Sequence, residues 1–342
     1  MDIDDRTQRR KEARRVFSKM GLSYFLFLTA ALAFQIAIAW IARWTGSRQL
    51  FASENRRIIL SMISMYAVGF PLFWQLVKRL PTGYGDSACE EEREKEKWGF
   101  LQFFICFVIS IGVMEVGNLI GNTLMSSINK GMQTEQMNDV FTMIMESNFL
   151  IILSFAVILG PVMEEIMFRK ILIDRTIRFG EVKAVIVSGV LFGLVHGNFY
   201  QFFYACGLGM IFAYVYIRTG KIRYTIIMHM TINGMSSILA GGLMKNMEYS
   251  RFLDFMAAGD MAGAMGVLGA HWISYMLLII YSLALIVTAF VGIILLICVL
   301  VQKKIHFFPP VQQIPGRFTY VPVFFNVGMI LFFLICTAEF LL

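Results

Sequence analysis

The amino-acid sequence predicts an all-α protein, a polytopic bundle of transmembrane helices, from three observations. Of the 342 residues, 58% are hydrophobic and only 15% are charged, and the mean hydropathy is +0.68, which excludes a water-soluble globular domain. Several apolar runs reach about 20 residues, the length that a helix needs to cross a bilayer. Basic residues gather in alternate connecting segments. Because backbone polar groups in lipid must pair within the segment, runs of this length form helices rather than strands.

Eight or nine apolar segments are expected to cross the membrane. They lie at residues 22–44, 58–77, 98–124, 149 through the Glu164 region, 184–197, 200–218, 224–243, 272–301 and 322 to the C-terminus. The first segment is too long for a signal-peptide core and no small-residue cleavage site follows it, so we expect it to be retained as a span.

A charged stretch at residues 90–97 (EEEREKEK) separates the first two spans from the others. We therefore expect residues 1–97 to hold a basic N-terminal tail, two accessory transmembrane helices and a charged loop. Residues 98–342 would form the functional helical bundle, with its motifs at about 150–243. The sequence has no internal repeat of the kind that inverted-repeat transporters show.

The formal net charge of +7 is explained by the positive-inside rule, so we expect no nucleic-acid partner. An integral plasma (inner) membrane protein with a cytoplasmic N-terminus is predicted. The loops at 125–147 and 245–271 would then lie outside. The expected cytoplasmic basic residues are Arg6, Arg9, Arg10, Lys11, Arg14, Arg15, Lys19, Arg169, Lys170, Arg175, Arg178, Arg218, Lys221, Arg223, Lys303 and Lys304. Four others, Arg43, Arg48, Arg56 and Arg57, fall on the predicted outer side and disagree with this pattern.

Ionisable groups inside spans are costly and indicate function by default. The first such cluster is PVMEEIMFR at 161–169. On a helix Glu165 and Arg169 lie one turn apart and can pair, which leaves Glu164 free. If this helix continues to Ile177 and stops at Gly180, Glu164 lies about 24 Å from its cytoplasmic end. The alternative interpretation is a juxtamembrane charge cluster.

Two further segments place polar groups in apolar helices. Phe192 and His196 lie four residues apart in an otherwise apolar span, where a lone histidine can also be a hydrogen-bonded packing residue. His229 and Asn233 have the i, i+4 spacing that stacks two side chains on one helical face. Each signal alone is weak, but three consecutive helices could bring the groups together.

Two chemistries fit a carboxylate, two imidazoles and an amide, and both end with water attacking an amide carbonyl. In one, Glu164 takes a proton from water, His196 positions the water, and His229 with Asn233 stabilises the oxyanion. In the other, Glu164, His196 and His229 ligate a divalent metal such as zinc, which lowers the pKa of bound water. The expected cofactor is therefore either none or one divalent metal.

The ordered motifs EE-x-x-x-R, F-x-x-x-H and H-x-x-x-N resemble those of the CPBP intramembrane protease family, which comprises type II CAAX prenyl proteases and bacterial Abi relatives. The resemblance covers roughly residues 150–243, about a quarter of the chain. It implies a helical bundle with a cavity open to the cytoplasm and to lipid. Carried over to this sequence, Glu164 looks like the catalytic carboxylate, and Glu165 with Arg169 looks like its supporting pair.

By the same resemblance, His196 would orient the water, Phe192 would pack beside it, and His229 with Asn233 would stabilise the oxyanion. The sequence thus predicts an intramembrane endopeptidase that acts on membrane-anchored or lipidated peptides, with membrane lipid and a peptide or lipidated protein as partners. The alternative is a non-catalytic bacteriocin-immunity or regulatory membrane protein that retains the fold.

Overall fold

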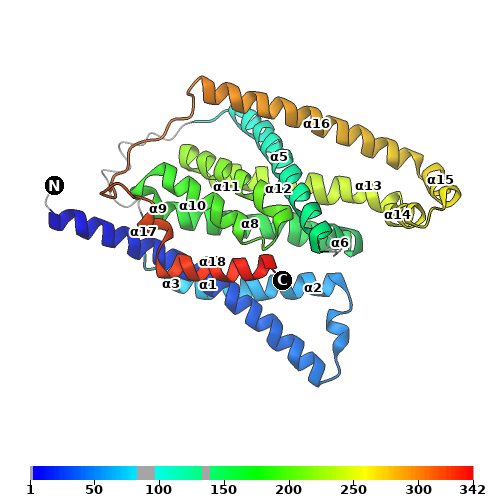
Figure 1. The fold of residues 1–342 in the computed structure, drawn as a ribbon, viewed down its shortest axis with the longest axis horizontal. Coiled ribbons are helices and arrows are strands. Elements are labelled where there is room, and N and C mark those ends of the chain that lie inside the picture. The colour runs from blue at the N-terminus through cyan, green and yellow to red at the C-terminus, as the bar shows by residue number, and fades with distance from the viewer. Residues whose placement is uncertain (1–2, 83–96, 133–138, 342) are drawn as a thin grey trace.

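The computed structural model describes residues 3–82, 97–132 and 139–341, and these are helices and the connections between them, without a strand (Figure 1). Within these residues, seven helices are long and apolar enough to cross a membrane. The all-α, polytopic prediction is confirmed. The seven spans are Asp4–Trp44, Glu54–Val77, Phe100–Gly131, Phe149–Phe179, Phe199–Thr219, Ile222–Asn246 and Trp272–Val301.

Two of the nine predicted spans are not among these seven. The segment predicted at 184–197 is helix α10, Glu181–Leu194, which has 14 residues and ends before His196. It ends there because Gly197 adopts a φ of +65° and Asn198 caps the next helix, its side chain accepting a hydrogen bond from the Gln201 amide. The segment predicted from residue 322 is divided into α17, Val321–Phe324, and α18, Val327–Leu341, where Asn326 accepts from the Met329 amide.

The N-terminal helix α1, Ile3–Trp44, packs against α18 and α3 on one side of the bundle (Figure 1). The span that returns beside it consists of α2, Glu54–Met62, a π-helical stretch Ile63–Gly69, and α3, Phe70–Val77. Tyr24 of α1 is fully buried, and its ring lies 4.9 Å from those of Phe73 and Phe168 and 5.8 Å from that of Phe332. The first two spans therefore share one hydrophobic cluster with the motif-bearing helix.

The helix that carries the two glutamates is continuous from Phe149 to Phe179 but changes its winding along its length. It comprises α7, Phe149–Ile151; a π-helical stretch Ile152–Leu159; α8, Gly160–Glu165; a second π-helical stretch Ile166–Ile171; α9, Leu172–Thr176; and a 3₁₀ turn Ile177–Phe179. The predicted stop at Gly180 is confirmed, since this residue has a φ of +123°.

The opposite side of the bundle is built on α5, Phe100–Met132, which packs along α11, Phe199–Thr219, and α16, Trp272–Val301. Between them lie α12, Ile222–Gly234, a π-helical stretch Met235–Ala240, and α13, Gly241–Asn246. Three short helices lie at the end of the bundle away from the N-terminus (Figure 1). They are α6, Asp139–Glu146; α14, Tyr249–Ala257; and α15, Met261–Ala270.

Contacts at the other end tie three distant segments together. Arg178, after α9, pairs with Glu12 of α1 at 3.1 Å, and its carbonyl accepts from the Gln312 amide at 2.8 Å. The Phe308 amide donates to Glu181 of α10. The N-terminal part of α1, the end of the motif helix and the connection between α16 and α17 therefore share one end of the bundle.

Candidate active site

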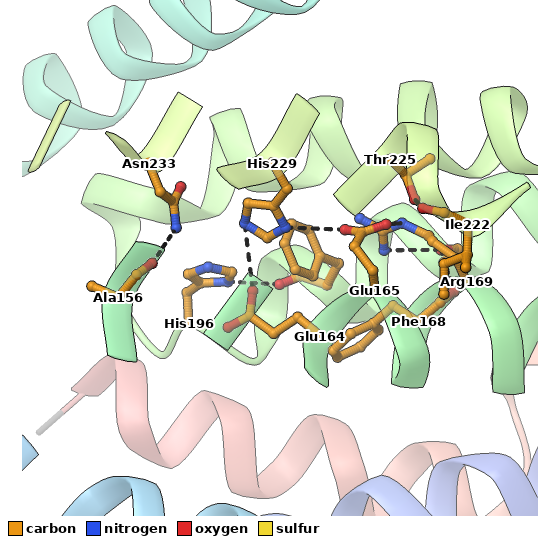
Figure 2. A network of polar contacts seen from close by, with 12 residues as sticks. Ala156, Glu164, Glu165, Phe168, Arg169, His196, Ile222, Thr225, His229 and Asn233 are labelled. Atoms are coloured by element: carbon orange, nitrogen blue, oxygen red, sulfur yellow. Dashed lines mark hydrogen bonds and ion pairs between the residues drawn. The ribbon is translucent and has the colours of Figure 1, made fainter. Parts of the chain in front are cut away.

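The three motifs converge within the bundle (Figure 2). Glu164 and Glu165 lie at the end of α8, His229 and Asn233 lie on α12, and His196 lies in the connection between α10 and α11. Arg169 lies in the π-helical stretch that follows α8, so each of the six charged or polar motif residues is placed by a helix or by the turn that follows one.

Glu165 is the anchor of a buried polar network. Its Oε2 lies 3.1 Å from Arg169 Nε, and both side chains are inaccessible to solvent. This distance is that of a close ion pair, although Glu165 Oε2 and Arg169 Nε do not form a hydrogen bond with each other. The other carboxylate oxygen of Glu165, Oε1, lies 3.0 Å from His229 Nδ1. The predicted pairing of Glu165 with Arg169 one turn apart is present.

His229 lies between the two adjacent glutamates. Because an ionised carboxylate only accepts hydrogen bonds, Nδ1 carries the proton that it donates to Glu165. Nε2 faces Glu164, whose Oε2 lies 3.6 Å away. Glu164 keeps 24% of its side chain exposed, against 0% for Glu165. The sequence predicted that Glu164 lies apart from the Glu165–Arg169 pair, and the structure adds that Glu164 faces the His229 imidazole.

Phe192 is the packing centre of the cluster. Its ring lies 5.0 Å from the His196 ring and 5.6 Å from the His229 ring, in both cases edge to face. The Arg169 guanidinium lies 4.5 Å from its centroid. An aromatic ring at this position fixes two imidazoles and balances a buried cation with its π face.

His196 is oriented by its own helix end. Its Nδ1 lies 2.7 Å from the Phe192 carbonyl oxygen. A carbonyl only accepts, so Nδ1 carries the proton and Nε2 of the neutral ring is left as an acceptor. Asn198 in turn donates to the His196 carbonyl at 2.7 Å.

Asn233 lies one turn beyond His229 on the same face of α12. Its Nδ2 donates to the Ala156 carbonyl at 2.9 Å, in the first π-helical stretch of the motif helix. An amide nitrogen carries two hydrogens, so one donor remains for another group. Among the four proposed catalytic residues, Asn233 is the one that borders a neighbouring cavity.

The described residues contain no group of three His, Cys, Asp or Glu side chains arranged to hold a metal ion. The zinc ligand set that the sequence left open, Glu164, His196 and His229, does not form such a group in the described residues, and we derive no step through a metal.

Sequence reasoning missed two residues that support the site. Ser188 of α10 donates to the Phe168 carbonyl at 2.9 Å and lies 3.4 Å from an Arg169 nitrogen. Tyr24 of α1 donates to the Met167 carbonyl at 2.9 Å. A serine in an apolar run is a weak signal for Ser188. Tyr24 lies 143 positions from its partner, and nothing local in the sequence indicates that contact.

Comparisons with known proteins assign this region to a family. Residues 146–235 match the family model "Type II CAAX prenyl endopeptidase Rce1-like". "Putative membrane peptidase YdiL" of Bacillus subtilis (strain 168) is 34% identical over 107 residues, which are 30% of this chain and 42% of that protein. "Membrane-embedded CAAX protease MroQ" of Staphylococcus aureus (strain USA300) is 33% identical over 93 residues, 25% of this chain and 37% of that protein.

The matched segment includes every motif residue from Glu164 to Asn233. The chain spans less than half the length of either curated relative. No solved structure gives a significant match.

Proposed function

We propose that this chain, whose residues 146–235 match the Rce1-like CAAX prenyl endopeptidase family model and which is similar to two membrane peptidases, is an integral-membrane endopeptidase of the CPBP family. It would hydrolyse peptide bonds of membrane-anchored or lipidated peptides with an activated water. The observation that carries the proposal is the partly exposed Glu164 carboxylate, 3.6 Å from an imidazole that Glu165 holds on its other side.

In the proposed reaction Glu164 acts as the general base. It takes a proton from a water molecule whose oxygen attacks the carbonyl carbon of the substrate. His196 Nε2, which is left as an acceptor, holds the second hydrogen of the water and so aims its lone pair. Glu164 then gives its proton to the leaving nitrogen as the C–N bond breaks, which yields a carboxylic acid and an amine.

His229 and Asn233 would stabilise the negative charge that develops on the carbonyl oxygen. In this step His229 acts in its doubly protonated form, with Nδ1–H donating to Glu165 and Nε2–H donating to the oxyanion. The remaining amide hydrogen of Asn233 supplies a second donor. Preorganised donors are effective here because a site shielded from water strengthens electrostatic interactions.

The proposal includes the membrane and the orientation. The protein would reside in the plasma membrane with its N-terminus in the cytoplasm, because the basic segments of α1, the motif helix and the connection before α17 share one end of the bundle.

The experiment is hydrolysis of prenylated and unprenylated membrane-anchored peptides by the purified protein in lipid. Glu164→Gln keeps the shape of the side chain but removes the base, so we expect a loss of about 10²- to 10⁴-fold in kcat. Asp254→Asn, which alters an exposed carboxylate of α14, is the matched control and keeps wild-type activity.

Repeating the assay with a chelator distinguishes the carboxylate-base mechanism from a metal mechanism. Cleavage that survives chelation but is lost in Glu164→Gln supports the carboxylate base. Cleavage that a chelator abolishes and zinc restores would replace it with a metal mechanism. Failure of the wild-type protein to cleave any peptide would favour a non-catalytic immunity or regulatory protein.

A further inference from the structure

A cavity of about 300 Å³ adjoins the candidate active site on the side of Asn233. Its walls come from α5, α6, α11, α12, the π-helical stretch that follows α12, α13 and α16. Since α6 and α13 flank it, it extends from the site toward the end of the bundle away from the N-terminus (Figure 1).

Close packing of α5 on α11 builds one wall of this cavity. A Cβ atom at Gly117 would lie 2.5 Å from the Tyr204 backbone nitrogen, and one at Gly121 would lie 2.5 Å from the Phe199 carbonyl oxygen. These glycines have the G-x-x-x-G spacing that lets transmembrane helices approach closely. The approach places Glu115 and Asn118 in the cavity wall.

A chain of hydrogen bonds connects the cavity with the turn that holds His196. Tyr204 and Gln201 line the cavity, and Gln201 Nε2 donates to the Tyr204 hydroxyl at 2.9 Å. Asn198 donates to Gln201 Oε1 at 3.0 Å and to the His196 carbonyl at 2.7 Å. The cavity and the candidate site therefore share one polar framework.

Glu115 is the one charged side chain among the described residues that line the cavity. It lies in the membrane-spanning part of α5, half buried, with a hydrogen bond from Asn118. A carboxylate inside a span is costly unless it serves a partner. No Lys, Arg or His is among those lining residues, so none of them supplies a complementary charge to this carboxyl group.

We propose that this cavity binds the substrate beside the scissile bond, and that Glu115 selects a lysine or arginine side chain there. The inference rests on the proposed endopeptidase function and names its substrate class, a cationic peptide segment. Asn233 links the two regions because it borders the cavity and lies one turn from His229 on α12. An entering cation itself favours the ionised form of Glu115 and pairs with it in surroundings of low dielectric constant.

The first test uses membrane-anchored peptides with acetylated N-termini that carry lysine or its uncharged analogue norleucine at each position near the cleaved bond. For wild type we expect kcat/KM to favour lysine by at least about tenfold at one position. Glu115→Gln should reduce that ratio to about one, whereas Glu115→Asp should keep the preference. Glu146→Gln removes the same charge from an exposed residue of α6 that does not line the cavity, and should leave the ratio unchanged.

A second test measures binding without turnover. Fluorescent lysine and norleucine peptides are titrated into Glu164→Gln and into Glu164→Gln/Glu115→Gln in lipid nanodiscs. We expect the lysine peptide to bind about tenfold more tightly than the norleucine peptide to the first protein and equally to the second. A parallel norleucine peptide with a free N-terminus shows whether an α-ammonium group can replace the side chain.

The two proposals fail in different ways. If no peptide is cleaved but lysine peptides still bind more tightly than norleucine peptides, and this preference depends on Glu115, the endopeptidase proposal is overturned and the cationic site is kept. Cleavage that requires Glu164 but shows the same lysine-to-norleucine ratio in wild type and Glu115→Gln would overturn the cationic site alone.

Discussion

Neighbouring glutamates 164 and 165 are chemically identical, and their surroundings give them different roles. Glu165 is fully buried and contacts Arg169 and His229, whereas Glu164 keeps access to solvent. The sequence predicted this division, because i, i+4 spacing on a helix joins Glu165 to Arg169 and turns Glu164 away. The distance from each carboxylate to His229 depends on the packing of α12 and could not be read from the spacing.

The buried pair leads to a prediction for stability. Arg169→Met leaves the Glu165 charge without its cation in a site closed to solvent, so we expect the free energy of unfolding to fall by about 3–5 kcal/mol. Thermal unfolding of the purified protein in detergent measures it. Arg251→Met removes the partner of Glu248 from an exposed pair at 2.9 Å and should leave the thermal unfolding transition unchanged. Equal effects of the two substitutions would contradict the structural role assigned to the pair.

At the scale of helices, the motif helix combines regular and π-helical winding around its two glutamates. π-Helical stretches precede α8 at 152–159 and follow it at 166–171. Such stretches recur at functional sites because they redirect side chains and free backbone groups. One of these carbonyls, that of Ala156, accepts from Asn233. Hydropathy located the helix but contains no signal for its winding.

The contact between α5 and α11 gives a prediction at the same scale. Gly117→Ala places a methyl group against the Tyr204 backbone, so we expect a loss of about 1–3 kcal/mol in the free energy of unfolding. Gly242→Ala in α13 is the matched control, since a Cβ there meets nothing within 4 Å and alanine favours a helix. Thermal unfolding of both variants tests this prediction. An unchanged unfolding transition in Gly117→Ala would show that α5 and α11 are not in close contact.

At the scale of the whole molecule, the helices place α14 at the end of the bundle opposite the N-terminal part of α1 (Figure 1). If the N-terminus is cytoplasmic, α14 lies outside the membrane barrier. A cysteine introduced as Asp254→Cys should react with a membrane-impermeant maleimide in intact cells. Gln8→Cys should react only after permeabilisation.

Both positions are exposed, and wild type measures the background from the native cysteines. The reverse labelling pattern would invert the proposed topology, and labelling of both variants in intact cells would place both ends on the same side.

The sequence by itself determined the all-α architecture, the position of most spans and the residue types of the three motifs. These follow from local properties, since lipid forces any long apolar segment to satisfy its backbone as a helix. Only the tertiary structure decided that His229 lies between the two glutamates, that Tyr24 supports the motif helix from α1, and that Glu115 borders a cavity beside Asn233. Each of these features depends on how side chains from separate helices fill common space, and no local pattern in the sequence encodes that packing.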